Sequence, residues 1–169
     1  MAWRSDVVGD LYIECARDIH FILGGLNMSS ELKSKKNATG YFNVRVDGKE
    51  PLKQDSKSFD VKEGSVEIWV LEGVGGPMAP RTHLLLGFQG DYPSGRHDAT
   101  KLLKVEYKEW SDMHGFEYKA KSGWVEVSST PSPRRITGKF EMVVGIHSSS
   151  PPGAPSEKTV SGDFDLTNE

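Results

Sequence analysis

The sequence has few of the residues on which several classes of protein depend. Cys15 is the only cysteine among 169 residues, so no intrachain disulfide can form and a zinc site built on paired cysteines is excluded. The 21 basic and 24 acidic residues nearly cancel, which leaves a net charge of −3. Such a chain has no strong positive field to attract a phosphate backbone, and we expect no nucleic-acid partner.

Long hydrophobic runs are also lacking. The most apolar N-terminal stretch, residues 7–26, is interrupted by Asp10, Glu14, Arg17 and Asp18. A transmembrane helix needs about 20 predominantly apolar residues and a signal peptide needs an unbroken apolar core, so the sequence predicts neither. With a single cysteine the chain suits the cytoplasm, or a secreted protein whose leader has been removed.

The sequence is rich in glycine and in segments where apolar and polar residues alternate. Its 18 glycines and 9 prolines favour short strands joined by many turns. From Tyr41 onward, apolar residues recur at every second position in successive segments, several of which end in a turn dipeptide such as Asp47-Gly48 or Glu63-Gly64. About nine or ten such strands, without helical crossovers, predict an antiparallel β-sandwich or a flattened barrel.

Individual strands can be placed from this alternation. They are predicted around residues 42–46, 59–61, 66–70, 84–88, 103–107, 116–120, 125–127, 136–142 and 160–166. The run Leu84–Phe88 is almost continuously apolar, as expected for a strand at the centre of a sheet. A turn is predicted at Lys121-Ser122-Gly123, between two strands of a meander.

The first forty residues differ from the rest. Leu11, Ile13 and Cys15 alternate like strand residues, yet the same region would also suit a short helix. A polar stretch, Ser29–Gly40, then reads as a linker. We therefore divide the chain into residues 1–40, an N-terminal extension or first strands with a polar linker, and residues 41–169, the β-sandwich domain.

The last two predicted strands share a pattern. Ile136-Thr137-Gly138-Lys139-Phe140 and Val160-Ser161-Gly162-Asp163-Phe164 place an aliphatic residue, a glycine and a phenylalanine at two-residue spacing. If these strands pair, the glycines permit a bulge, a bend or the packing of a neighbouring aromatic ring. The pattern resembles the C-terminal strands of small bacterial β-sandwich domains of unknown function, which are often surface lipoproteins. The resemblance implies a fold, and neither an activity nor a site.

Catalytic and metal-binding patterns are not found in the sequence. The glycine-rich segment Leu71–Pro77 lacks the Gly-Lys-Ser/Thr ending of a phosphate-binding loop. The five histidines never fall at the i, i+4 spacing of a helical metal site, and there is no Gly-x-Ser-x-Gly elbow. We predict no cofactor and no metal, and an enzyme such as a hydrolase is the weakest hypothesis.

The best candidate for a binding surface is the segment Gly87–Thr100, interpreted as a loop between two strands. It concentrates Tyr92, Arg96, His97 and Asp98. Aromatic and arginine side chains combine contact area with directed hydrogen bonds, and a rigid β scaffold can present them on its loops.

Trp69 and Trp124 are a second candidate. Each falls on the strand face opposite the clearest aliphatic positions, where its ring could stack on a sugar, although packing in the core explains both equally well. The sequence as a whole predicts a noncatalytic binding or interaction module for an unknown protein or small ligand. The alternatives are a lipocalin-like barrel around a small apolar ligand and a carbohydrate-binding module. The sequence does not fix the oligomeric state.

Overall fold

The structure is a computed structural model of the chain, and it describes residues 38–73, 79–111 and 114–168. All of them belong to one compact unit, Ser34–Glu169. Nearly all of the regular structure within these residues is antiparallel β-sheet, as predicted, and the only helix among them is a single 3-10 turn, η1 (Ala99–Lys101). The interpretation of residues 1–37 as an extension, first strands or a short helix lies outside the described residues.

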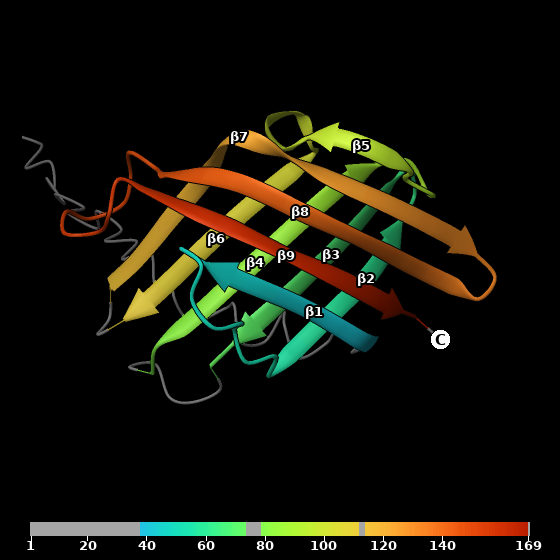
Figure 1. Ribbon diagram of the computed structural model, residues 1–169, viewed down its shortest axis with the longest axis horizontal. Helices are drawn as coiled ribbons and strands as arrows, with labels where there is room; N and C mark the ends of the chain where they lie inside the picture. The colour runs from blue at the N-terminus through green and yellow to red at the C-terminus, as the bar shows by residue number, and fades with distance from the viewer. Residues whose placement is uncertain (1–37, 74–78, 112–113, 169) are drawn as a thin grey trace, which may run out of the picture. The chain divides into compact units, whose positions relative to one another are not determined.

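Nine strands make up this part of the chain (Figure 1). They are β1 (Thr39–Val46), β2 (Ser56–Lys62), β3 (Ser65–Glu72), β4 (Arg81–Gln89), β5 (Gly95–Asp98), β6 (Lys104–Ser111), β7 (His114–Pro131), β8 (Arg134–Ile146) and β9 (Glu157–Thr167). They form one sheet in the order β1-β9-β8-β7-β6-β4-β3-β2, and β5 pairs with β7 beside that path.

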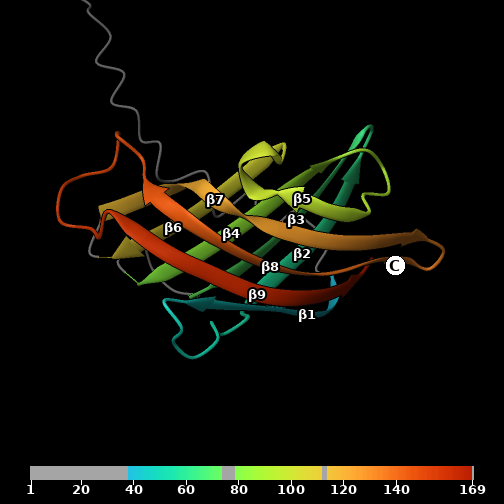
Figure 2. The ribbon, with the colours of Figure 1, turned by 45° about the horizontal axis from the view of Figure 1, so that its top comes forward.

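The sheet folds over so that its two ends meet. Figures 1 and 2 show β1, β9 and β8 crossing β2, β3, β4 and β6 as a second layer. The Ala38 backbone N–H donates to the Lys57 carbonyl oxygen at 3.2 Å, and the Asn168 side-chain amide donates to the Phe59 carbonyl oxygen at 2.8 Å, both reaching β2 from the β1–β9 end of the sheet. The result is a nearly closed, flattened barrel.

The remaining edge of β1 is covered by the loop that follows it. The Leu52 N–H donates to the Val44 carbonyl oxygen at 2.8 Å, and the Phe42 N–H donates to the Gln54 side-chain oxygen at 2.7 Å. An uncovered strand edge is a template for pairing with another chain. The loop therefore removes part of the free edge that a flattened barrel leaves between its first and last strands.

Inward side chains fill the space between the two layers. Twenty of them are at most 2% exposed: Phe42, Val44, Phe59, Val66, Ile68, Val70, Leu84, Leu86, Phe88, Ala99, Tyr107, Tyr118, Val125, Ile136, Phe140, Met142, Val144, Val160, Phe164 and Leu166. A side chain that lines a void wide enough for water keeps accessible surface, and these side chains keep almost none. The interior is packed around them.

Strand β7 corrects one prediction. The two strands expected on either side of a turn are a single strand of 18 residues. In place of the turn, the pairing with β8 shifts register between Ala120 and Ser122, and Gly123 takes φ 118°. This bulge moves the inward positions from even-numbered Tyr118 to odd-numbered Val125, so that both halves of the strand bury their apolar face. In the sequence, a bulge that switches the inward-facing residues from even to odd numbers looks the same as a turn between two strands.

Strands β8 and β9 pair through their shared glycine pattern. Gly138 lies opposite Phe164, and Phe140 lies opposite Gly162. A Cβ added at Gly138 would lie 2.5 Å from the Phe164 ring, and one at Gly162 would lie 2.8 Å from the Phe140 ring. Each ring therefore covers the glycine of the other strand, and the two rings stack with centroids 6.5 Å apart.

Candidate functional site

The segment predicted as a loop between two strands contains a strand of its own. Arg96, His97 and Asp98 lie on β5, which pairs with Trp124–Val127 in the second half of β7. Strand β6 reaches only the first half of β7, so β5 continues the sheet where β6 ends. The four residues Gly-Arg-His-Asp include no aliphatic side chain, and alternation of apolar residues could not reveal them.

Two of the β5 side chains have structural roles. The His97 ring packs against Phe88 with centroids 6.2 Å apart. The Asp98 carboxylate accepts hydrogen bonds from the Thr100 N–H at 2.9 Å and the Thr100 hydroxyl at 2.8 Å. The hydroxyl and then the N–H lower the pKa of Asp98, so this side chain is an ionised cap for η1 and not a proton donor at neutral pH.

Arg96 and Trp124 are brought together on the outward face. The Arg96 guanidinium carbon lies 4.3 Å from the centroid of the Trp124 ring, and the Lys139 ammonium lies 6.0 Å from it. Glu126 forms an ion pair with Lys139 at 3.2 Å. A cation already stacks on the indole, so Trp124 offers less open ring surface than an aromatic platform for a sugar requires.

Trp69 does not join this surface. It points outward from β3, opposite the aliphatic positions, as its spacing predicts, but the side chain is only 1% exposed. Its register partners on the same face, Ser58 and Leu85, are buried as well. Trp69 therefore presents no ring to solvent.

Tyr92 is the most exposed aromatic side chain among the described residues, at 48%. It lies in the loop between β4 and β5. The Ser129 hydroxyl donates to the carbonyl oxygen of the next residue, Pro93, at 2.9 Å. This bond fixes the loop beside the β7–β8 hairpin, so Tyr92 is presented from an anchored position.

Sequence reasoning missed a hollow on the outward face of that hairpin. It has a volume of about 420 Å³ and is lined by Ser128, Thr130, Ser132, Pro133, Arg135 and Thr137. Four of these residues sit in two facing pairs, because β7 and β8 place Ser128 opposite Thr137 and Thr130 opposite Arg135. The alternating hydroxyls are visible in the sequence, but their meeting depends on the hairpin register.

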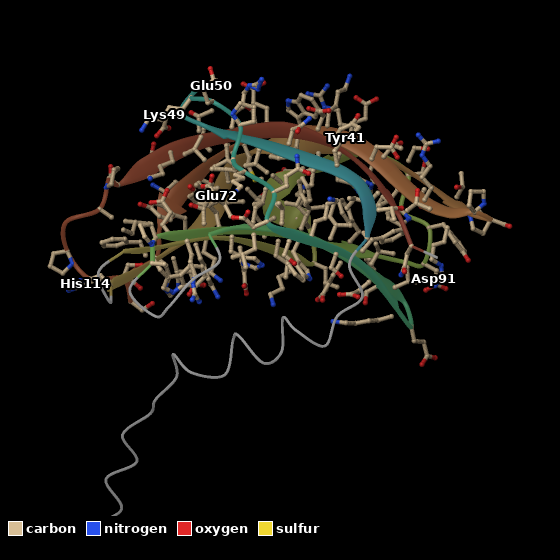
Figure 3. All side chains as sticks on the ribbon, turned by 90° about the horizontal axis from the view of Figure 1, so that it is seen from below. Tyr41, Lys49, Glu50, Glu72, Asp91 and His114 are labelled. Atoms are coloured by element: carbon tan, nitrogen blue, oxygen red, sulfur yellow. The ribbon has the colours of Figure 1, made fainter. Side chains whose placement is uncertain are left out.

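An ion pair holds the guanidinium of this hollow. The Arg135 Nε–H donates to Asp165 Oδ1 at 2.7 Å, and Arg135 Nη2 donates to Asp165 Oδ2. The Arg135 hydrogen bonds lower the pKa of Asp165, so both partners are charged at neutral pH. In the same row across the sheet, Tyr41 lies opposite Asp165 on β1 and is 42% exposed (Figure 3).

A second polar cluster lies between the layers at one end of the barrel. Glu109 accepts a hydrogen bond from the Tyr107 hydroxyl at 2.5 Å and pairs with the Lys158 ammonium at 2.6 and 2.7 Å. The Tyr118 hydroxyl is buried with no hydrogen-bond partner within the described part of the chain. Burial, and then the Glu109 carboxylate, raise the pKa of Tyr118 to about 12, and Tyr107 is shifted upward further. Both phenols therefore stay protonated and neither can act as a base at neutral pH.

Glu72 belongs to the same end of the barrel. Strands β3, β4 and β6 place it in one row with Thr82 and Glu109. Figure 3 shows Glu72 between the two layers. Its carboxylate accepts a hydrogen bond from the Lys53 N–H at 2.8 Å, which ties the loop before β2 to this end.

One histidine lies beside a hydroxyl. His147 Nδ1 is 2.7 Å from Ser149 Oγ, but it also accepts the Ser149 N–H at 3.3 Å, as in an ordinary turn between residues two apart. Within residues 38–73, 79–111 and 114–168 no carboxylate contacts this imidazole, and no group of three His, Cys, Asp or Glu could hold a metal ion. The pair thus lacks the orienting group of a catalytic triad.

Comparison with known proteins does not assign the chain to a family. No family model, curated protein or solved structure matches the chain. The resemblance to bacterial β-sandwich domains stays a prediction, and a functional conclusion has to come from the side chains themselves. Among the described residues, no helix is long and apolar enough to cross a membrane.

Proposed function

We propose that the domain is a noncatalytic binding module whose binding surface is the outward hollow of the β7–β8 hairpin together with the neighbouring side chains of Tyr41 and Tyr92. The observation that carries this proposal is the hollow of the β7–β8 hairpin. It lies on a nearly closed, packed sheet, and the Arg135–Asp165 pair fixes one of its walls. Exposed Tyr41 and Tyr92 flank the region from β1 and from the β4–β5 loop.

A packed interior favours a surface site over an internal one. A lipocalin-like barrel needs an apolar cavity, whereas side chains such as Phe42, Phe140 and Phe164 contact one another between the layers. An apolar ligand would have to displace them, and forcing extra volume into a packed core typically costs about 1 to 3 kcal/mol even for a few methylene groups.

The noncatalytic assignment is supported by the roles of the ionisable groups. Asp98 caps η1, and the His97 ring packs on Phe88. Tyr107 and Tyr118 hold their protons. None of these groups is placed beside a nucleophile with an orienting partner.

The charges on the outward face favour a partner that is not a nucleic acid. Arg96, Glu126, Lys139 and Asp163 follow one another across β5, β7, β8 and β9, so that opposite charges are neighbours. A phosphate backbone is bound by a continuous row of positive charge. The alternation suits a protein or a small polar ligand.

The proposal can be tested by thermal unfolding in the presence of four ligand classes: oligosaccharides, short peptides, divalent cations and fatty acids. A ligand at about 100 times its Kd stabilises the native state by about 2.7 kcal/mol. For a chain of this size that raises Tm by roughly 5 to 10 °C. We expect one class to do so, and the ligand to be recovered chemically unchanged.

Two variants place the site. Ser128→Arg fills the hollow, whereas Thr159→Arg makes the same kind of change at an exposed position of β9 outside it. The shift in Tm should disappear in the first variant and persist in the second. Conversion of the ligand to a product would refute the noncatalytic role, and an equal response of both variants would place binding elsewhere.

A further inference from the structure

The hollow of the β7–β8 hairpin has unused hydrogen-bonding capacity. Ser128 and Ser132 form no hydrogen bond through their hydroxyls within the described residues, and the Thr137 hydroxyl has only a long contact of 3.5 Å with the Ser128 carbonyl oxygen. Each hydroxyl can both donate and accept. A ligand for this hollow must therefore supply several groups that also donate and accept.

The charged wall of the hollow points to the same chemistry. Arg135 uses Nε and Nη2 for Asp165, which leaves the Nη1 donors available. The Asp165 carboxylate occupies the Nε and Nη2 side of the guanidinium, so the Nη1 donors on the other side stay available to a ligand. These donors and the hydroxyls of the hollow match a ligand whose own hydroxyls both accept and donate.

The charged side chain that lines the hollow and the one in the next outward row are both paired with carboxylates. Arg135 is balanced by Asp165, and Lys139 in the next row is balanced by Glu126 at 3.2 Å. An oxyanion such as phosphate or sulfate would be attracted by uncompensated positive charge, which these pairs do not provide. A neutral ligand fits better.

Apolar contact surface lies at two borders of the hollow. Pro133 is one of its lining residues. The row Ser128, Thr137, Asp165, Tyr41 runs across four neighbouring strands, so the exposed Tyr41 ring lies next to Asp165. Partial burial and the nearby Asp163 raise the pKa of Tyr41, and its ring stays neutral. Aromatic rings stack on the C–H faces of sugars, so the Tyr41 ring and the hydroxyls of the hollow offer the two kinds of contact that a sugar makes.

We infer that this hollow, extended by Tyr41, binds a neutral saccharide. The inference rests on the proposed binding function and names its ligand class. It also moves the sugar site away from Trp69 and Trp124, the tryptophans that the sequence offered for that role. From β7 to β1 the row spans three strand spacings, or about 14 Å, which suits a short oligosaccharide.

The test is a microarray of neutral and anionic oligosaccharides probed with the purified chain, followed by calorimetric titration of the best binder. The neutral set contains glucose, mannose, xylose and N-acetylglucosamine oligomers, and the anionic set contains sialylated, sulfated and uronic-acid glycans. We expect binding within the neutral set, with an affinity that is constant from pH 5 to 9, because no histidine lines the hollow and Asp165 stays ionised.

Matched variants locate the sugar. Thr137→Val and Tyr41→Ala should each weaken saccharide binding at least tenfold. Thr159→Val makes the same exchange of a hydroxyl for a methyl group at an exposed position of β9 outside the hollow, and should leave the affinity unchanged. Unfolding curves of all three show whether each variant folds. Binding that survives Thr137→Val and Tyr41→Ala overturns the inference.

The other outcomes separate this inference from the function on which it depends. Binding confined to anionic glycans overturns the neutral class. If no glycan binds but a peptide does, and Ser128→Arg abolishes it, the saccharide is wrong and the binding module stands. If no ligand class binds at all, both are wrong.

Discussion

The reciprocal packing of glycine and phenylalanine on β8 and β9 gives the sharpest prediction about stability. In Gly138→Ala the new Cβ would lie 2.3 Å from the Glu126 carbonyl oxygen and 2.5 Å from the Phe164 ring. Both distances are well below normal contact, and the first involves backbone, so a strand must shift. Overpacking of this kind costs about 1 to 3 kcal/mol.

An opposing term reduces that cost. Alanine restricts the unfolded chain more than glycine does, which favours folding by about 0.4 to 1 kcal/mol. We therefore expect Gly138→Ala to lower the free energy of unfolding by about 1 to 2 kcal/mol, measured by urea denaturation at 25 °C. Gly162→Ala should behave alike, because its Cβ would lie 2.0 Å from the Asn43 carbonyl oxygen.

Two controls isolate the cause. Gly115→Ala meets only the movable Trp110 side chain at 3.0 Å, and its free energy of unfolding should change by less than about 0.5 kcal/mol. Combining Gly138→Ala with Phe164→Leu removes part of the clash, so the double variant should be more stable than the sum of the single effects by at least about 0.5 kcal/mol. Additive single effects, or an unchanged Gly138→Ala, would refute the reciprocal packing.

Four further predictions concern polar groups. Tyr118→Phe should raise the free energy of unfolding by about 1 kcal/mol, because it removes a buried hydroxyl without a partner in the described residues. Tyr107→Phe should lower the free energy of unfolding by a similar amount, because it removes a hydrogen bond to the Glu109 carboxylate. Urea denaturation curves compare the two variants. Both tyrosines have a pKa in the folded state above the unfolded value of about 10. Their contribution to stability is therefore complete below pH 10 and is lost as pH rises toward 12, which alkaline unfolding should show. Asp165→Asn should reduce the loss of stability on acidification, because the lowered pKa of Asp165 stabilises the fold above its unfolded pKa and that gain disappears as pH falls through the folded value. Arg96→Ala should shift one of four fluorotryptophan NMR signals, that of Trp124, and an unchanged spectrum would contradict the cation–π contact.

Most of the fold could be predicted because one physical rule governs it. Where one strand face is buried and the other wet, apolar residues alternate, as in β6 and β9. For the glycines of β8 and β9 the sequence left a bulge, a bend or a packed aromatic ring open, and the structure shows the aromatic ring. The rule failed at β5, which has no aliphatic residue, and within β7, where a bulge imitates a turn. Both failures concern backbone pairing, which side-chain polarity does not report.

The candidate site was harder to predict, because it depends on contacts between strands. Arg96 was selected as a binding residue, but its contact with Trp124 exists only because β5 pairs with β7. Asp98 looked available for binding, yet a hydroxyl only two residues away occupies it. Trp69 shows the converse limit: its alternation predicted an outward position, and only the structure shows that this position is buried.

The β7 bulge that misled the strand prediction also creates the proposed site. Before it, the even-numbered residues of β7, such as Tyr118, point into the core. Without the shift after Ala120, the even-numbered Ser128 and Thr130 would point inward as well, and Val125 and Val127 would face solvent. One extra residue thus buries the valines and turns the serine and threonine hydroxyls toward Thr137 and Arg135. Core packing and the outward hollow therefore depend on the same bulge. Selection for a stable barrel is enough to preserve the β7–β8 pairing that forms the hollow.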